Sequence, residues 1–60
     1  MSETLKRILT SLERIHTKTG LRVGEALING ARISQLSGFY QISDERLAEA
    51  LEEYEKEMNK

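Results

Sequence analysis

The large aliphatic residues in the first third of the chain recur at intervals of three and four positions, as they do on one side of a helix. They are Leu5, Ile8, Leu9, Leu12 and Ile15. Ser2 can cap the start of such a helix, and Gly20 can end it in the left-handed conformation that favours glycine. The pattern predicts a helix over residues 3–17.

The same spacing returns in the last third of the chain. The apolar positions there are Leu47, Ala50, Leu51, Tyr54 and Met58. Ser43 is suited to be the N-cap of this segment, and two acidic residues follow it where the helix dipole favours negative charge. We therefore predict a second helix over residues 44–58.

The middle of the chain fits two patterns. Asn29-Gly30 between two apolar runs is typical of a two-residue β-hairpin turn. Residues 26–28 are apolar without alternating, however, and the apolar positions over residues 23–33 keep helical spacing. We expect one continuous helix over residues 22–37, ended by Gly38, in preference to the hairpin.

These elements predict an all-α fold, a compact three-helix domain that covers residues 1–60. A chain of this size buries only about 60% of the surface that its unfolded form exposes, and with no cysteine it has no disulfide to compensate. We therefore expect a homodimer. The candidate contact surfaces are the small residues Ala26, Gly30 and Ser34, which share a helical face, and the apolar pair Tyr54 and Met58.

Charge is divided unevenly along the chain. Residues 44–60 hold 7 acidic and 3 basic residues, a net charge of −4, whereas residues 1–33 hold 3 acidic and 6 basic residues, a net charge of +3. The two parts sum to the net charge of −1 for the whole chain. The predicted acidic face of the last helix consists of Asp44, Glu45, Glu49, Glu52 and Glu53. Such a split suits head-to-tail self-association or docking onto a charged protein.

Candidate catalytic and metal-binding groups are sparse. His16 is the only histidine, and there is no cysteine, so a transition-metal site would need carboxylates for almost every other ligand. The acidic pairs of the last helix are expected to face water, which keeps both carboxylates ionised and unsuited to acid–base work. We expect no enzyme, no cofactor and no metal site.

The N-terminal segment lacks the apolar core of a signal peptide, and no run approaches the roughly 18 apolar residues that span a bilayer. We therefore expect a cytoplasmic protein without a membrane partner.

Two stretches of sequence form a recognisable pattern. The first is Thr19-Gly20-Leu21-Arg22-Val23-Gly24-Glu25, followed by Asn29, and the second is Phe39-Tyr40-x-Ile42-x-Asp44-Glu45-x-Leu47. The pattern, which covers about half of the chain, resembles short uncharacterised bacterial and phage proteins, although these have glutamine at the position of Glu25 and alanine at that of Gly30. The resemblance implies a compact helical protein of unassigned activity.

Composition and motifs together favour a small non-catalytic module for protein–protein interaction or regulation. Two alternatives stay open. A helix-turn-helix arrangement of the last two helices would bind DNA, although acidic residues on the recognition helix would repel phosphates. Conversely, the acidic helix could imitate nucleic acid and inhibit a DNA-handling enzyme.

Overall fold

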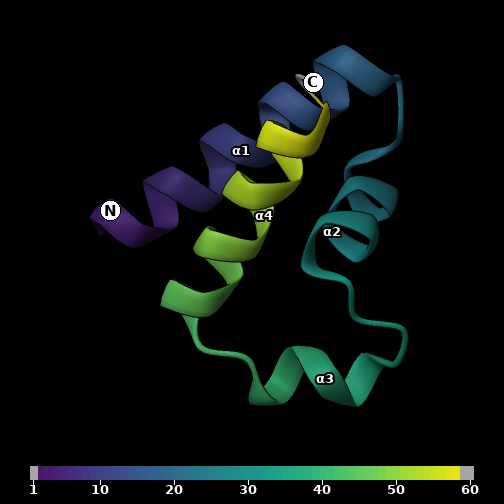
Figure 1. Ribbon diagram of the computed structural model, residues 1–60. Helices are drawn as coiled ribbons and strands as arrows, with labels where there is room; N and C mark the ends of the chain where they lie inside the picture. The colour runs from purple at the N-terminus through teal and green to yellow at the C-terminus, as the bar shows by residue number, and fades with distance from the viewer. Residues whose placement is uncertain (1, 59–60) are drawn as a thin grey trace.

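The computed structural model describes residues 2–58, so both ends of the predicted domain lie just outside the described part. It contains four helices: α1 (Glu3–Thr19), α2 (Val23–Ala31), α3 (Leu36–Gln41) and α4 (Asp44–Met58) (Figure 1). No strand occurs within residues 2–58, which confirms the all-α prediction. The alternative hairpin turn at Asn29-Gly30 is excluded, because both residues lie inside α2.

The two outer helices begin and end close to the predicted residues. At the start of α1, the Leu5 N–H donates to the hydroxyl of Ser2 at 3.1 Å. At its end, Gly20 has a φ of 75° and its N–H donates to the carbonyl of His16 at 3.0 Å. The bounds of α4 are those predicted, and the Arg46 N–H donates to its N-cap Ser43 at 3.1 Å.

The single central helix predicted over residues 22–37 is wrong, and so is the count of three helices. The helix stops at Ala31 because Arg32 adopts a left-handed conformation with φ of 59°, while its N–H still donates to the Ile28 carbonyl at 3.0 Å. The guanidinium of Arg32 also forms an ion pair with Glu57 on α4. This contact fixes the end of α2 beside the last helix. Gly38, predicted to end the helix, lies inside α3.

The interior is formed by α1, α2 and α4, which pack against one another (Figure 1). Its buried residues are Ile8, Leu12, Ile15, Ala26, Ala48 and Leu51. In contrast, no Cα atom of α3 lies within 8 Å of a Cα atom in another helix. The short helix stands apart from the other three, at the bottom of the view in Figure 1.

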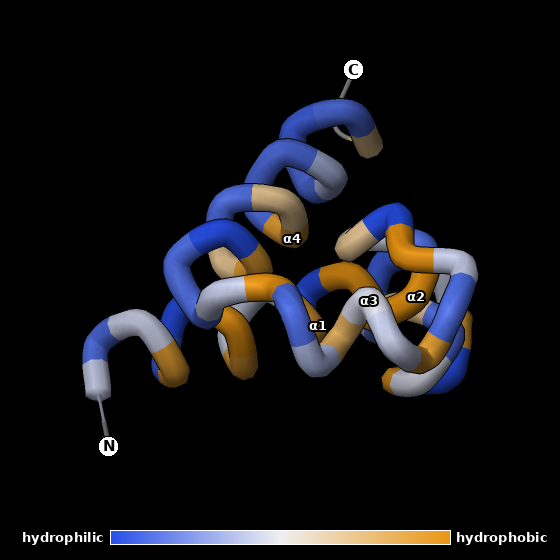
Figure 2. The backbone as a smooth tube through the Cα atoms, turned by 90° about the horizontal axis from the view of Figure 1, so that it is seen from below, coloured by the Kyte–Doolittle hydropathy of each residue, from blue (hydrophilic) through white to orange (hydrophobic). Residues whose placement is uncertain are grey.

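Within the described part of the chain, the helices are too short or too polar to cross a membrane. The polarity of the last helix is visible in Figure 2, where the turns near the end of α4 are mostly hydrophilic.

Candidate functional site

The small residues predicted as a contact surface lie mostly in the chain's own interior. Ala26 is fully buried and Gly30 is buried beside α4. A Cβ atom placed on Gly30 would lie 2.5 Å from Cδ2 of Leu51 and 3.7 Å from Cδ1 of Ile15. Small residues at these positions therefore let α2 approach α4 within the same molecule. Ser34 is exposed and follows the end of α2, so it does not share a helical face with the other two.

The second predicted contact surface, Tyr54 and Met58, is only partly accessible. Both residues are half-buried and pack against the hydrophobic core. Most of their apolar area is therefore used inside the molecule.

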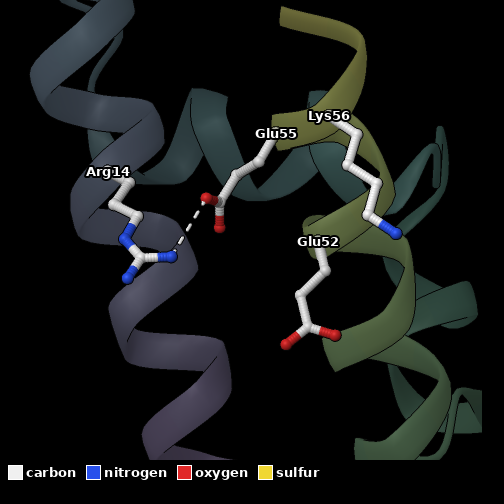
Figure 3. Close-up of a pocket in the computed structure, with 4 residues that line it drawn as sticks. All are labelled: Arg14, Glu52, Glu55 and Lys56. Carbon is white, nitrogen blue, oxygen red and sulfur yellow. Dashed lines mark hydrogen bonds and ion pairs between the residues drawn. The ribbon is translucent and has the colours of Figure 1, made fainter. Parts of the chain in front are cut away.

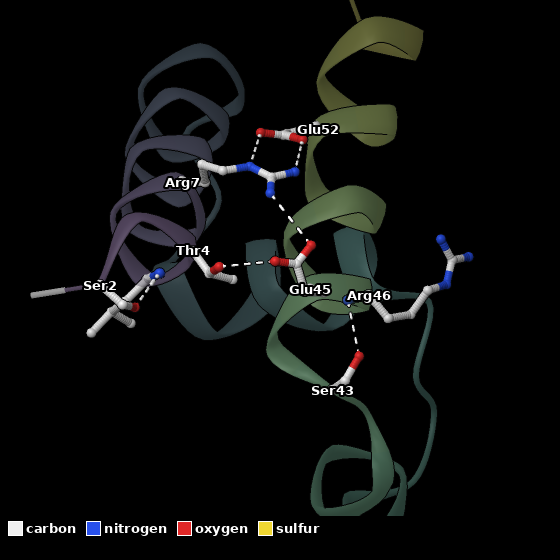
Figure 4. Close-up of polar contacts among 8 residues, drawn as sticks. Ser2, Thr4, Arg7, Ser43, Glu45, Arg46 and Glu52 are labelled. Atoms are coloured by element: carbon white, nitrogen blue, oxygen red, sulfur yellow. Dashed lines mark hydrogen bonds and ion pairs between the residues drawn. The ribbon is translucent and has the colours of Figure 1, made fainter.

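Two acidic residues of α4 meet Arg7 of α1 (Figure 4). Arg7 binds Glu52 with two hydrogen bonds, from Nε to Oε2 at 3.0 Å and from Nη2 to Oε1 at 2.7 Å. Its Nη1 lies 3.8 Å from Oε2 of Glu45, whose other oxygen accepts from the Thr4 hydroxyl at 3.2 Å. One guanidinium thus links two turns of α4 to α1.

This geometry shifts the acidities of the paired groups. The hydrogen bonds from Arg7 lower the pKa of Glu52 below its ordinary value, and the same bonds raise the pKa of Arg7. In the same way, the hydrogen bond to Glu57 raises the pKa of Arg32. Each of these shifts favours the charged form of Arg7, Arg32 or Glu52, as expected for groups in ion pairs.

A third cross-helix pair joins Arg14 on α1 to Glu55 on α4 at 3.5 Å (Figure 3). The Glu55 side chain is only 14% exposed, and its Oε1 is buried without a hydrogen-bond partner. These two residues, with Glu52 and Lys56, line a hollow of about 310 Å³ on the surface. Its lining holds two cations and two anions, so the hollow carries no net charge that would select a charged ligand.

The predicted charge split is therefore partly neutralised inside one molecule. Two of the five residues assigned to the acidic face, Glu45 and Glu52, are paired with Arg7. The other three, Asp44, Glu49 and Glu53, are exposed and form no ion pair within residues 2–58. Head-to-tail association would have to compete with these intramolecular pairs, and it stays a prediction.

The described residues contain no group of three or more histidine, cysteine, aspartate or glutamate side chains placed to hold a metal ion. His16 is exposed at the end of α1, where its Nδ1 lies 2.6 Å from the carbonyl oxygen of Leu21. This contact ties the loop after α1 to its last turn.

Within residues 2–58, the most exposed large apolar side chains are on α3. Leu36 is 73% exposed and Tyr40 is 83% exposed, and their spacing of four residues puts them on the same side of the short helix. We call this pair the α3 face. Neither residue is among the contact surfaces predicted from the sequence. The sequence did contain a signal that could have marked this segment as a candidate contact surface. Residues 33–43 include no charged residue in a chain that is 32% charged.

The fold and this site define a class: a small all-α protein that packs three helices together and exposes an uncharged fourth one. No protein-family model matches the chain, and no curated protein or solved structure is significantly similar to it. The likeness to short bacterial and phage proteins therefore stays a prediction.

Proposed function

We propose that this chain is a small, non-catalytic module that binds a protein partner or itself, and that its role is regulatory. The proposal places it in the cytoplasm of a bacterium or of a cell infected by a phage. The observation that supports it best is the α3 face, which presents an aliphatic and an aromatic side chain to solvent on a helix with no Cα atom within 8 Å of one in another helix.

Covering an exposed pair of this kind is favourable. Burying a leucine or an aromatic side chain contributes roughly 1.5–3 kcal/mol, and tyrosine is enriched among the residues that dominate interface energies. A helix of six residues is also far shorter than the roughly 12–15 residues that an isolated helix needs to be even marginally stable in water. A partner protein that packs on the α3 face would supply both the missing burial and the missing tertiary support.

The two alternatives based on charge have less support. Three of the six basic residues within 1–33, Arg7, Arg14 and Arg32, are bound to carboxylates of α4. A DNA phosphate would have to displace these intramolecular partners. Pairing equally reduces the free carboxylates that α4 could offer to a nucleic-acid-binding groove.

The proposed function is tested with a variant that removes the apolar character of α3 without adding charge. We expect immobilised wild-type protein to capture a partner that the double variant Leu36→Gln/Tyr40→Gln does not capture. Glu49→Gln, which changes an exposed residue of α4, is the matched control and should behave as the wild type. Capture that is equal for all three proteins, with helicity verified by circular dichroism, would show that α3 is not the binding surface.

The charge-based alternatives have their own test. Binding to random duplex DNA at about 50 mM salt that fades by about 200 mM would favour the DNA reader. Absence of such binding, together with competition against DNA for a DNA-handling enzyme, would favour the mimic.

A further inference from the structure

The connection between α2 and α3 begins with a helix break at Arg32, a residue type that does not favour one. Within residues 2–58, Arg32 is the only residue other than glycine with a positive φ. For a residue with a Cβ atom, this left-handed conformation is less favourable than the right-handed helical one. The chain has no proline, and the glycines nearest to the break lie inside helices, Gly30 in α2 and Gly38 in α3. The local sequence therefore does not account for the break.

The break also leaves backbone donors without a helical partner. The N–H groups of Ile33, Ser34 and Gln35 donate to no backbone carbonyl within residues 2–58. In a helix that continued past the end of α2, they would donate to the carbonyls four residues earlier. The sequence supplies an end for such a helix at Gly38, since glycine is favoured in the left-handed position after a last turn. This signal is unused, because Gly20 is the only glycine with a positive φ in the described residues.

An ion pair ties the break to a distant part of the chain. Nη2 of Arg32 lies 2.5 Å from Oε1 and 2.6 Å from Oε2 of Glu57, which is 25 residues further along. A second contact at the break is local, because Ile33 lies so close to Gly38 that a Cβ atom there would be 2.6 Å from Cγ2 of Ile33. Changing the φ of Arg32 from 59° to the helical value would rotate its Cβ atom by about 120° about the N–Cα bond. A continuous helix therefore turns the Arg32 side chain away from its present direction towards Glu57.

We infer that the Arg32–Glu57 ion pair acts as a conformational switch. While the pair is formed, α2 ends at Ala31 and α3 is a separate helix; when the pair is lost, residues 23–37 form one helix that ends before Gly38. Both side chains are more than half exposed, so the pair is a weak interaction that a substitution or a competing charged group can break. The left-handed conformation of Arg32 is also only a small cost. Because the two opposing terms are both small, loss of the pair is enough to change the balance between the two forms.

The rest of the fold permits the second form. Extending α2 by residues 32–37 lengthens it by about 9 Å. Residues 38–43 would then cross to the start of α4, and six extended residues reach roughly 20 Å, whereas packed helices are about 8–10 Å apart. No Cα atom of α3 lies within 8 Å of one in another helix, so loss of α3 as a separate helix parts no packed pair of helices.

The inference deepens the proposed function, and its biological meaning rests on that function. Leu36 and Tyr40 share one side of α3 because they are four residues apart in one helix. In the second form the helix ends before Gly38, so Leu36 belongs to the long helix and Tyr40 to the connection that follows it. The α3 face is then lost. The Arg32–Glu57 pair therefore decides whether the proposed binding surface is formed.

The first experiment measures amide hydrogen exchange residue by residue with NMR. We expect the N–H groups of residues 33–35 to exchange rapidly in the wild type and about tenfold or more slowly in Glu57→Ala and in Arg32→Ala, because both variants lack the pair. Glu49→Ala, which replaces an exposed residue of α4 that forms no ion pair within residues 2–58, is the control and should exchange as the wild type. Unchanged exchange at residues 33–35 in Glu57→Ala or in Arg32→Ala overturns the inference.

The second experiment separates the ion pair from the backbone conformation at the same position. Arg32→Gly and Arg32→Ala both lose the pair, but glycine adopts the left-handed conformation at little cost and alanine does not. Arg32→Gly should therefore keep the break and show the rapid exchange of the wild type, whereas Arg32→Ala should show slow exchange at residues 33–35. Slow exchange in both variants would contradict the proposed competition between the pair and the helix.

Failure of this inference can be told apart from failure of the proposed function, because the exchange measurement needs no partner. Slow exchange in Glu57→Ala, together with loss of a partner that the wild type captures, supports both. Slow exchange in Glu57→Ala while no form of the chain captures a partner through Leu36 and Tyr40 supports the switch and contradicts the proposed function. Unchanged exchange, together with capture that depends on Leu36 and Tyr40, contradicts the switch alone.

Discussion

Replacing Gly30 by alanine has two opposite effects on the free energy of unfolding: it improves helix propensity, and it disturbs packing. An alanine inside a helix is more favourable than glycine by about 1 kcal/mol. The new Cβ atom, however, would lie 2.5 Å from Cδ2 of Leu51, whereas carbon atoms in ordinary contact are about 3.5–4.0 Å apart. Leu51 would have to move by about 1 Å or more within a filled core, since its side chain is fully buried.

Overpacking of this kind typically costs about 1–3 kcal/mol, which exceeds the gain in propensity. We therefore expect Gly30→Ala to lower the free energy of unfolding by about 0.5–2 kcal/mol. In a domain of this size each kcal/mol corresponds to about 4–8 °C in Tm. Thermal unfolding followed by circular dichroism, at one protein concentration, measures the change.

The same helix offers a matched control. Gly24 is exposed, and a Cβ atom placed on it would meet no atom within 4 Å. Gly24→Ala should therefore raise Tm, by an amount that corresponds to about 0.5–1 kcal/mol. If both substitutions raised Tm alike, the close approach of α2 to α4 at Gly30 would be refuted.

Three further predictions concern the core, the caps and the ion pairs. Leu51→Ala should lower the free energy of unfolding by about 2–5 kcal/mol, which is comparable to the roughly 3–5 kcal/mol that so small a core supplies. Circular dichroism should then show a largely unfolded chain, whereas Leu36→Ala should leave the free energy of unfolding almost unchanged. Ser43→Ala should cost about 1 kcal/mol in urea unfolding, because α4 loses its N-cap, and an unchanged midpoint would count against that cap. The pKa of Glu52 is lower in the folded than in the unfolded chain, so its pairing with Arg7 stabilises the protein above the ordinary glutamate pKa and is lost as pH falls through the folded value. Urea midpoints should consequently drop more between about pH 6 and pH 3 for the wild type than for Glu52→Gln, and equal drops would contradict the pairing.

The outer helices could be predicted from the sequence because their signals are local. Ser2 and Gly20 cap α1, and Ser43 caps α4, through hydrogen bonds that span only a few residues. The apolar spacing between these caps is enough to identify the buried side of each helix. Local sequence signals therefore predicted both ends of α4 correctly and placed the end of α1 two residues too early.

The break in the middle could not be predicted by the same rules. Arginine has no special preference for the left-handed conformation that Arg32 adopts, and no glycine or proline marks the position. The conformation is accompanied by a contact with Glu57, which is 25 residues further along the chain. A contact at such a distance leaves no trace in the local pattern.

The candidate site was missed for a related reason. Helical spacing identifies apolar stripes, but it does not show which of them are buried against another part of the same chain. Gly30, predicted to face another molecule, fits against Leu51 of its own chain, whereas Tyr40, which was not predicted as a contact residue, faces solvent. The run without charge over residues 33–43 carried the relevant information and was not used.

The separation of α3 from the packed helices has a consequence for how such a protein can diverge. Since Leu36 and Tyr40 are exposed and no Cα atom of α3 lies within 8 Å of one in another helix, substitutions at these two positions do not disturb the interior formed by α1, α2 and α4. Selection can then alter what the molecule recognises while folding stability is maintained by a different set of residues. The sequence of this segment can therefore change while the fold is kept. Relatives of this chain should vary most at the positions of Leu36 and Tyr40 when their partners differ.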